Sequence, residues 1–155
     1  MKQILYFILK HPLGSKRPIK ALFRFFSWQI SYRLLNRREI IFSVTDKSKM
    51  KLKPGLAGAS GNYYCGLLEF EDMAFCLHYL RSEDVFFDVG ANVGIFSILA
   101  SGHVGCQSIA FEPDNDTIVN LNENISINQI SNKVKLIRMA VGEEEGVVRF
   151  SKSKD

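Results

Sequence analysis

The chain of 155 residues is 46% hydrophobic and 23% charged, which is typical of an ordinary folded domain and excludes disordered and fibrous classes. Its formal net charge of +4 is unevenly distributed, because residues 1–55 hold 13 Lys and Arg against two acids, while residues 56–155 hold seven against 14. The basic first part favours contact with a membrane surface, a phosphorylated substrate or an acidic partner, although a solvated basic face would give the same composition.

The first predicted elements lie in this basic part. The apolar run at residues 4–9 ends at Lys10, so it is far shorter than the roughly 20 residues that a membrane span requires. Between Pro18 and Asn36, apolar residues recur at helical spacing: Ile19, Leu22, Phe23, Phe26 and Ile30. This spacing predicts an amphipathic helix that either covers one edge of the main sheet or lies on a membrane surface through residues 19–35.

A hairpin is predicted at residues 39–53, where two short apolar runs flank a turn at residues 46–48. Residues 54–62 contain three glycines and a proline, which favour a break in regular structure, and the charge composition changes at the same place. We therefore expect two units: a basic helical and hairpin extension at residues 1–55, and a second domain that begins at residue 56.

Helices and strands alternate in the second unit. A helix is predicted at residues 69–80, and the apolar strand that follows at residues 85–89 is typical of burial on both faces. The next elements are a helix at 95–100, a strand at 108–111, a helix at 114–129, a strand at 134–138 and a short strand at 147–150. This order predicts an α/β fold with a parallel sheet and helices on both faces. Because an open doubly wound sheet has more strands, we expect the fold to be incomplete at the C-terminus.

The turn after residues 85–89 contains Gly90 and Gly94, and such a turn lets a ligand approach the backbone and the N-terminus of the next helix. Asp88 comes two residues before Gly90, where it contacts a ligand, caps the turn itself, or does both. Glu112 ends the next strand, 22 residues after Gly90, and Pro113 prevents that strand from continuing. An acid in this place accepts hydrogen bonds from the hydroxyls of an adenosine ribose.

The loop favours S-adenosylmethionine (SAM) over a nicotinamide dinucleotide. A dinucleotide loop has the pattern G-x-G-x-x-G, in which the second glycine lets the pyrophosphate lie against the backbone. Asn92 stands where that glycine belongs. SAM has no pyrophosphate, and a carboxylate such as Asp88 attracts its cationic ammonium group. The residues therefore predict SAM as the cofactor, with a nicotinamide oxidoreductase as the alternative.

From about Gly66 to Phe150 the sequence resembles the FkbM family of SAM-dependent methyltransferases. The motifs that carry the resemblance are Gly66-Leu67-Leu68-Glu69-Phe70-Glu71, Asp88-Val89-Gly90-Ala91-Asn92-Val93-Gly94, Ala110-Phe111-Glu112-Pro113, Asn120-Leu121-Asn122-Glu123-Asn124 and Ala140-Val141-Gly142-Glu143. The resemblance implies a Rossmann-like class I methyltransferase fold. It also implies the cofactor-binding residues: Asp88, Gly90, Asn92 and Gly94 on the first SAM motif, Glu112 at the ribose, Pro113 and Asp114 at the adenosine edge, and Ala140 beside the adenine. Family members often have a polar residue where Met139 stands.

The resemblance further implies an enzyme that methylates a hydroxyl of a sugar, a glycan or a polyketide-like metabolite. No catalytic base is identified, and no Cys and His spacing is typical of a metal site. The acceptor side of such a fold is built mainly after the third strand, so we expect this chain to be the cofactor-binding half and inactive alone. No nucleic-acid partner is expected, because the sequence contains no recognised module for one.

A second hypothesis makes the chain a non-catalytic module that docks on a membrane or a protein partner through its basic N-terminal helix. Under either hypothesis, the three cysteines form no disulfide framework. We therefore expect a cytoplasmic location, peripheral to the inner face of the membrane if the helix docks there.

Overall fold

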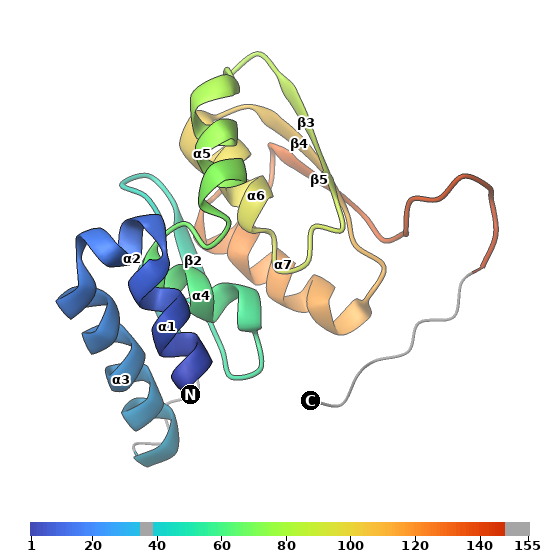
Figure 1. The fold of residues 1–155 in the computed structure, drawn as a ribbon. Coiled ribbons are helices and arrows are strands. Elements are labelled where there is room, and N and C mark those ends of the chain that lie inside the picture. Colours follow the sequence, from blue (N-terminus) through green and yellow to red (C-terminus); the bar gives the residue numbers. More distant parts are fainter. Residues whose placement is uncertain (35–38, 148–155) are drawn as a thin grey trace.

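The computed structural model describes residues 1–34 and 39–147, and Figure 1 shows helices of the N-terminal region beside a unit of alternating strands and helices. Three helices come first: α1 (Lys2–Lys10), α2 (Pro12–Lys16) and α3 (Pro18–Leu34). Helix α3 confirms the helix expected from Pro18, while residues 35 and 36 of that prediction lie outside the described residues. No helix in either described segment is long and apolar enough to span a membrane.

His11 fixes the junction between α1 and α2. Its Nδ1 accepts hydrogen bonds from the backbone N–H groups of Leu13 (3.2 Å) and Gly14 (3.4 Å), which caps α2. Because Nδ1 accepts, the ring proton is on Nε2, which donates a hydrogen bond to the carbonyl of Leu68, 3.1 Å away. The buried ring therefore ties the first two helices to a segment more than 50 residues further along the chain.

Helix α3 turns a different face to the core from the one that the sequence predicted. Its buried side chains are Ala21, Phe25 and Trp28, and the helix packs against α1 and α4 (Ala57–Cys65). Four of the five residues of the predicted apolar face lie almost opposite on the helix and are exposed: Ile19 84%, Phe23 72%, Phe26 46% and Ile30 51%. The fifth, Leu22, is partly buried against the core. Both faces are apolar, so periodicity alone does not distinguish the one that meets the core.

The predicted hairpin is confirmed, because β1 (Ile40–Ser43) pairs antiparallel with β2 (Lys49–Leu52). The expected break at residues 54–62 is wrong from residue 57 onward, where α4 begins. Gly61 lies inside this helix against Leu68, whose Cδ1 would be 2.5 Å from a Cβ at that position. Asn62 secures the same contact, since its side chain donates to the carbonyl of Gly58 and accepts from the N–H of Leu68. Close packing, and not a break, explains the glycine.

Helix α5 (Phe70–Tyr79) leads into a parallel sheet of order β3-β4-β5. The strands are β3 (Val85–Val89), β4 (Gln107–Phe111) and β5 (Val134–Ile137). The connections are α6 (Ile95–Ser97) with its π-helical continuation η1 (Ile98–Val104), and α7 (Asn115–Ile127). These elements confirm the predicted α/β fold class with a parallel sheet flanked by helices. The strand expected at 147–150 does not begin at Val147, which is irregular and fully exposed, and the rest of that range lies outside the described residues.

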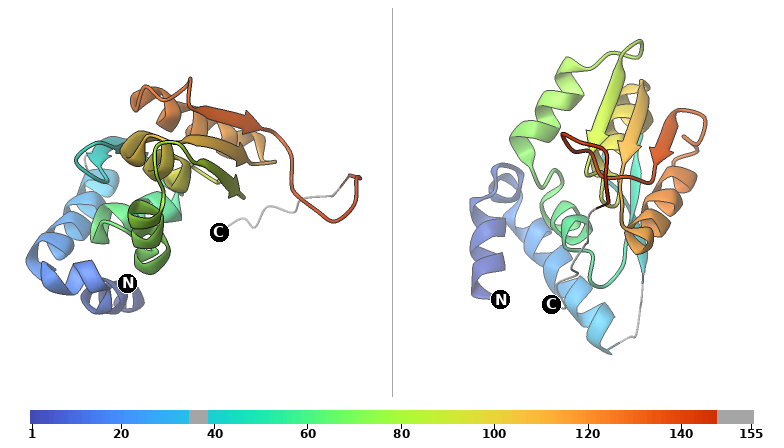
Figure 2. Two further views of the ribbon diagram at one scale, coloured as in Figure 1. Left: turned by 90° about the horizontal axis from the view of Figure 1, so that it is seen from above. Right: turned by 90° about the vertical axis from the view of Figure 1, so that its right-hand side faces the viewer.

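Both connections step in the same direction across the sheet, so right-handed crossovers place their helices on one face. The right-hand view of Figure 2 shows the three strands side by side, with the helix that follows β3 behind them. Over the described part of the chain, the predictions that helices cover both faces of the sheet and that β3 is buried on both faces are therefore wrong, since Val85, Phe87 and Val89 are 54%, 59% and 60% exposed. Within the described residues, β3 also has a strand partner on one edge alone.

One core joins the N-terminal helices, the hairpin and the helix after β3. Its fully buried large side chains are Ile8, Phe25, Met50, Leu52, Met73, Ile98 and Leu99. Hydrogen bonds add to this packing, because the amide side chains of Asn124 and Asn128 on and after α7 pair with the backbone of Lys51 and Lys49 in β2. The segments 1–55 and 56–147 thus share both a core and hydrogen bonds between amide side chains and the backbone of β2.

Candidate functional site

The loop between β3 and α6 takes three left-handed backbone conformations in five residues. Gly90, Asn92 and Gly94 have φ angles of 77°, 50° and 87°, and asparagine is among the few other residues that adopt this region readily. The N–H groups of Gly90 and Ala91 donate to the carbonyl of Phe111 at 3.0 and 2.9 Å, which holds the loop against the end of β4. A Cβ at Gly90 would meet no atom within 4 Å. The backbone there is open to the approach of a ligand.

Gly94, unlike Gly90, has no free space around it. It is buried and precedes the first residue of α6, and a Cβ at this position would lie 2.2 Å from Cδ1 of Leu121 on α7. The first glycine of the motif therefore leaves space for a ligand, whereas the second lets two helices pack closely.

Glu112 lies at the carboxyl end of β4, directly beside the loop. Its Oε2 accepts a hydrogen bond from the N–H of Asn92 and its Oε1 accepts one from the N–H of Asp114, each at 2.9 Å. The side chain is buried, yet a carboxylate offers about four acceptor positions, so roughly two remain for a ligand. The structure thus brings together three of the residues assigned to the cofactor.

Asp88 caps the helix that follows the loop. Its Oδ2 accepts hydrogen bonds from the N–H of Ser97 at 3.0 Å and from the hydroxyl of Ser97 at 2.6 Å. Burial raises the pKa of the Asp88 carboxyl, the bonds from Ser97 oppose that shift, and the nearby charge of Glu112 adds to it. The prediction that Asp88 caps its own turn is wrong, because N–H groups of the turn donate to Phe111 and Glu112, while Asp88 accepts from Ser97 in the helix.

Ionisation of Asp88 is expected to cost stability. The raised pKa means that the folded state binds the proton more tightly than the unfolded state. Proton binding by Asp88 therefore stabilises the folded state. This contribution is complete below the usual aspartate pKa of about 3.9 and is lost as the pH rises through the higher folded-state pKa. The variant Asp88→Asn does not ionise and lacks this loss. Urea unfolding between about pH 4 and 8 should show wild type losing stability relative to the variant as the pH rises. Parallel pH profiles would contradict the assignment.

The remaining predicted residues flank Glu112. Asp114 caps α7, because its Oδ1 accepts from two backbone N–H groups of the first turn at 2.8 and 3.0 Å. Pro113 and Ala140 line a cavity of about 740 Å³ together with the other residues of 139–147. Met139 in this wall is 59% exposed, and its thioether is a weak acceptor without a donor.

Sequence reasoning did not single out Ser97 and Asn124 as site residues. Ser97 binds Asp88 just before the glycine loop (residues 90–94), and Asn124 binds Val93 within it. Asn124 is fully buried, and its Nδ2 donates to the carbonyl of Val93 while its Oδ1 accepts from the N–H of Lys51, both at 2.8 Å. These partners are 31 and 73 residues distant in sequence. The Asn-rich motif at residues 120–124 is the signal that contains Asn124, and it does not indicate those partners.

Several solved structures are similar to this chain, including two that carry a bound cofactor analogue. One is Pyrococcus horikoshii TYW2 in complex with MeSAdo, with 18% identity and a TM-score of 0.53 over 66% of this chain and 36% of that one. The other is the tRNA (uracil-54, C5)-methyltransferase of Pyrococcus abyssi in complex with S-adenosyl-L-homocysteine, with 17% identity and a TM-score of 0.53 over 74% of this chain and 26% of that one. The chain has a Rossmann-like methyltransferase fold. It spans well under half the length of either structure, and neither a protein-family model nor a curated protein matches it.

Proposed function

We propose that this chain is the cofactor-binding part of a SAM-dependent methyltransferase of the FkbM type. The observation that carries the proposal is the contact between the glycine loop and the Glu112 carboxylate. This contact lies at the carboxyl edge of the sheet, where ligands bind in open α/β folds. The open backbone at Gly90 supports the proposal, as does the fold shared with a tRNA methyltransferase that was crystallised with S-adenosyl-L-homocysteine.

SAM, when bound, would supply an electrophilic methyl group, which an acceptor would attack in line as the bond from that carbon to sulfur breaks and S-adenosylhomocysteine leaves. The residues of this chain bind and orient SAM. Glu112 binds the ribose hydroxyls through its remaining acceptor positions, and Gly90 lets the cofactor lie against the loop. Pro113 and Ala140 border the adenine in their shared cavity. The charge of Asp88 behind the loop favours the cationic ammonium end of the cofactor.

The acceptor under this proposal is a hydroxyl of a sugar, a glycan or a polyketide-like metabolite. Transfer to a hydroxyl requires alignment of the oxygen and removal of its proton. The residues assigned above bind only the cofactor, so they do not supply the group that removes this proton. Because this chain is expected to be inactive alone, its longest natural extension is incubated with radiolabelled SAM and either hydroxyl-bearing glycans or tRNA, which compares the two acceptor classes. Label in glycan supports the proposed acceptor, and label in tRNA alone would replace the acceptor class while leaving the cofactor site intact.

Calorimetric titration of SAM, S-adenosylhomocysteine and NAD tests the cofactor. We expect the first two to bind and NAD not to bind. The variant Glu112→Ala should weaken SAM binding by about 1–3 kcal/mol, since it leaves hydrogen-bonding groups unpaired. Glu83→Ala, which removes an exposed acid elsewhere on the α/β unit, is the matched control and should bind SAM like wild type. Equal affinity of the Glu112→Ala variant and wild type would remove Glu112 from the site.

A second candidate function is docking on an anionic membrane surface through residues 19–35. The observation that favours it is the exposed stripe of Ile19, Phe23, Phe26 and Ile30, which lies beside Lys20 and Arg24 on the same helix. Sedimentation with phosphatidylcholine vesicles containing phosphatidylglycerol should show binding that Phe23→Ser abolishes. Phe75→Ser, on an exposed site of α5, is the control. Vesicle binding without any SAM binding would favour the non-catalytic module.

A further inference from the structure

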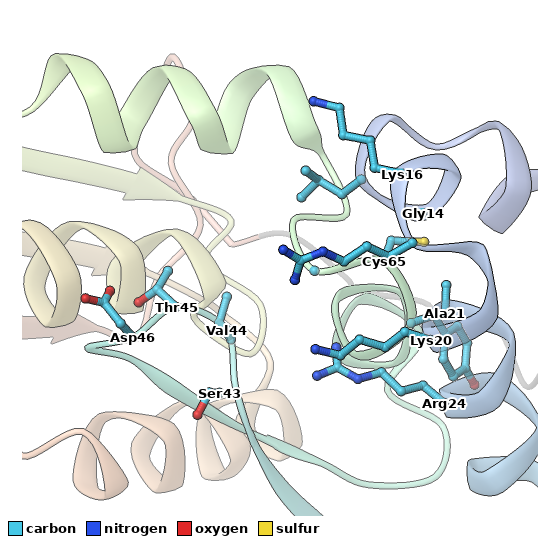
Figure 3. A pocket seen from close by; sticks show the side chains of 14 residues that line it. Gly14, Lys16, Lys20, Ala21, Arg24, Ser43, Val44, Thr45, Asp46 and Cys65 are labelled. Carbon is cyan, nitrogen blue, oxygen red and sulfur yellow. The ribbon is translucent and has the colours of Figure 1, made fainter.

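A cavity of about 610 Å³ separates α2 and the start of α3 from the end of β1 and the turn that follows it. Figure 3 shows the side chains of Lys16, Lys20 and Arg24 extending from these helices toward the opposite wall at residues 43–46. Arg17 also lines the cavity. Four cations from one stretch of chain therefore line a single cavity that is open to solvent.

These cations have no carboxylate partner within residues 1–34 and 39–147, where the ion pairs use Lys51, Lys53 and His103 instead. Asp46 in the opposite wall lies 3.3 Å from Nδ1 of His103, and Figure 3 shows its carboxylate well away from the lysines. Asp46 is thus the one acid among the described lining residues against four cations, and this excess of like charges makes the potential in the cavity favourable for an anion.

Arg24 is held in place by neutral groups. Its Nη1 donates to the carbonyl of Tyr63 at 3.0 Å, and its guanidinium carbon lies 5.2 Å from the centre of the Tyr63 ring. Neither partner carries a negative charge. The contacts therefore fix the side chain at the cavity without neutralising it, which lowers the entropic cost of binding a ligand there.

The N-terminus of α3 adds to the same potential. This 17-residue helix has no acidic residue in its first turn, and Arg17, Lys20 and Ala21 at its start line the cavity. The positive end of the helix dipole attracts anions at such a place. Side-chain charge and backbone polarity therefore favour the same kind of ligand.

We propose that this cavity binds a phosphate group. Guanidinium groups match phosphate oxygens in geometry, and ammonium groups add compact charge. The volume lies within the range of small-molecule sites, so a phosphate ester fits as well as the free ion. The wall residue Asp46 pairs with His103 near the end of η1, whereas the glycine loop lies at the start of α6. The site is therefore separate from the proposed cofactor site and does not depend on methyl transfer.

The phosphate has two chemical sources that fit. An apolar groove lined by Ile19 and Phe23 shares Lys16, Arg17 and Lys20 with the cavity, so a lipid headgroup could place its phosphate among the cations and its chains along the groove. A soluble phosphate ester would use the cations alone. The two sources share the same binding chemistry.

The test uses the full chain, with inorganic phosphate as the soluble probe and phosphatidylcholine vesicles with and without phosphatidylglycerol as the lipid probe. Backbone amide NMR shifts report phosphate binding against chloride at equal ionic strength, and sedimentation reports vesicle binding. The variant carries Lys16→Gln, Arg17→Gln and Lys20→Gln, all at exposed positions. The control carries Lys2→Gln, Lys10→Gln and Lys49→Gln, which are exposed, remove the same charge and do not line the cavity.

We expect the cavity variant to bind at least about tenfold more weakly than wild type, while the control stays within about twofold. Phosphate-dependent shifts at residues 14–24 and 43–46 would support a soluble ester as the source. Binding that requires phosphatidylglycerol would support a lipid headgroup. Phe23→Ser weakens vesicle binding through the apolar stripe but should leave phosphate shifts unchanged, which separates this site from the membrane docking proposed above. An equal loss in both triple variants, or no binding of either probe, would overturn the proposal.

Discussion

Replacing Gly94 with alanine is expected to lower the free energy of unfolding by about 2–5 kcal/mol. Two effects combine at this position. A Cβ would lie 2.2 Å from Cδ1 of Leu121, and the φ of 87° is a conformation that alanine adopts only with strain. Urea unfolding, followed by far-ultraviolet circular dichroism, measures the change.

Gly90→Ala is the matched control for this prediction. Its φ of 77° imposes a similar backbone strain, but a Cβ there meets no atom within 4 Å. The expected loss is therefore about 1–2 kcal/mol, from the backbone alone. Equal losses in the two variants would show that contact with Leu121 does not matter. In the pair Gly94→Ala and Leu121→Ala, the double variant should lose less than the sum of the single losses, because truncation of Leu121 removes the clash.

Asn124→Leu is expected to lower the free energy of unfolding by about 2–4 kcal/mol. The side chains are similar in size, so the change mainly removes hydrogen bonds. The carbonyl of Val93 loses its donor and the N–H of Lys51 loses its acceptor, and the Asn124 side chain that serves both is fully buried. Unpaired polar groups in such a place cost free energy that new apolar contacts do not restore.

Asn122→Leu on the same helix provides the comparison, because Asn122 is exposed. It makes the same chemical change with the same effect on helix propensity, and we expect a difference from wild type within about 0.5 kcal/mol. If the two leucine variants are equally stable, Asn124 does not hold the loop and the hairpin together.

The alternation of elements after residue 69 could be predicted because each signal is local. Short apolar runs, the glycines at 90 and 94 and Pro113 mark where the strands and helices begin and end, and β3, β4, β5 and α7 follow them. Helix α4 could not be predicted in this way. Gly61 looks like a break in sequence, and its reason is a contact with Leu68 that exists only in the folded chain.

Burial was harder to predict than secondary structure. Helix α3 has one apolar face with Phe25 and another with Phe23, and the position of α4 decides which is covered. Strand β3 has the composition of a fully buried strand, yet its burial depends on where the crossovers run. The same limit applies to the site. Asp88, Asn92 and Glu112 follow from a motif, whereas Asn124 acts through partners that no nearby residue indicates.

The buried side-chain amide of Asn124 couples the β1–β2 hairpin to the glycine loop. It joins the carbonyl of Val93 to the N–H of Lys51 in β2, so the opening of either end frees the other. Thermodynamic coupling of this kind is reciprocal. A molecule that settles against the glycine loop should therefore slow hydrogen exchange at the Lys51 amide, on a strand that it never touches.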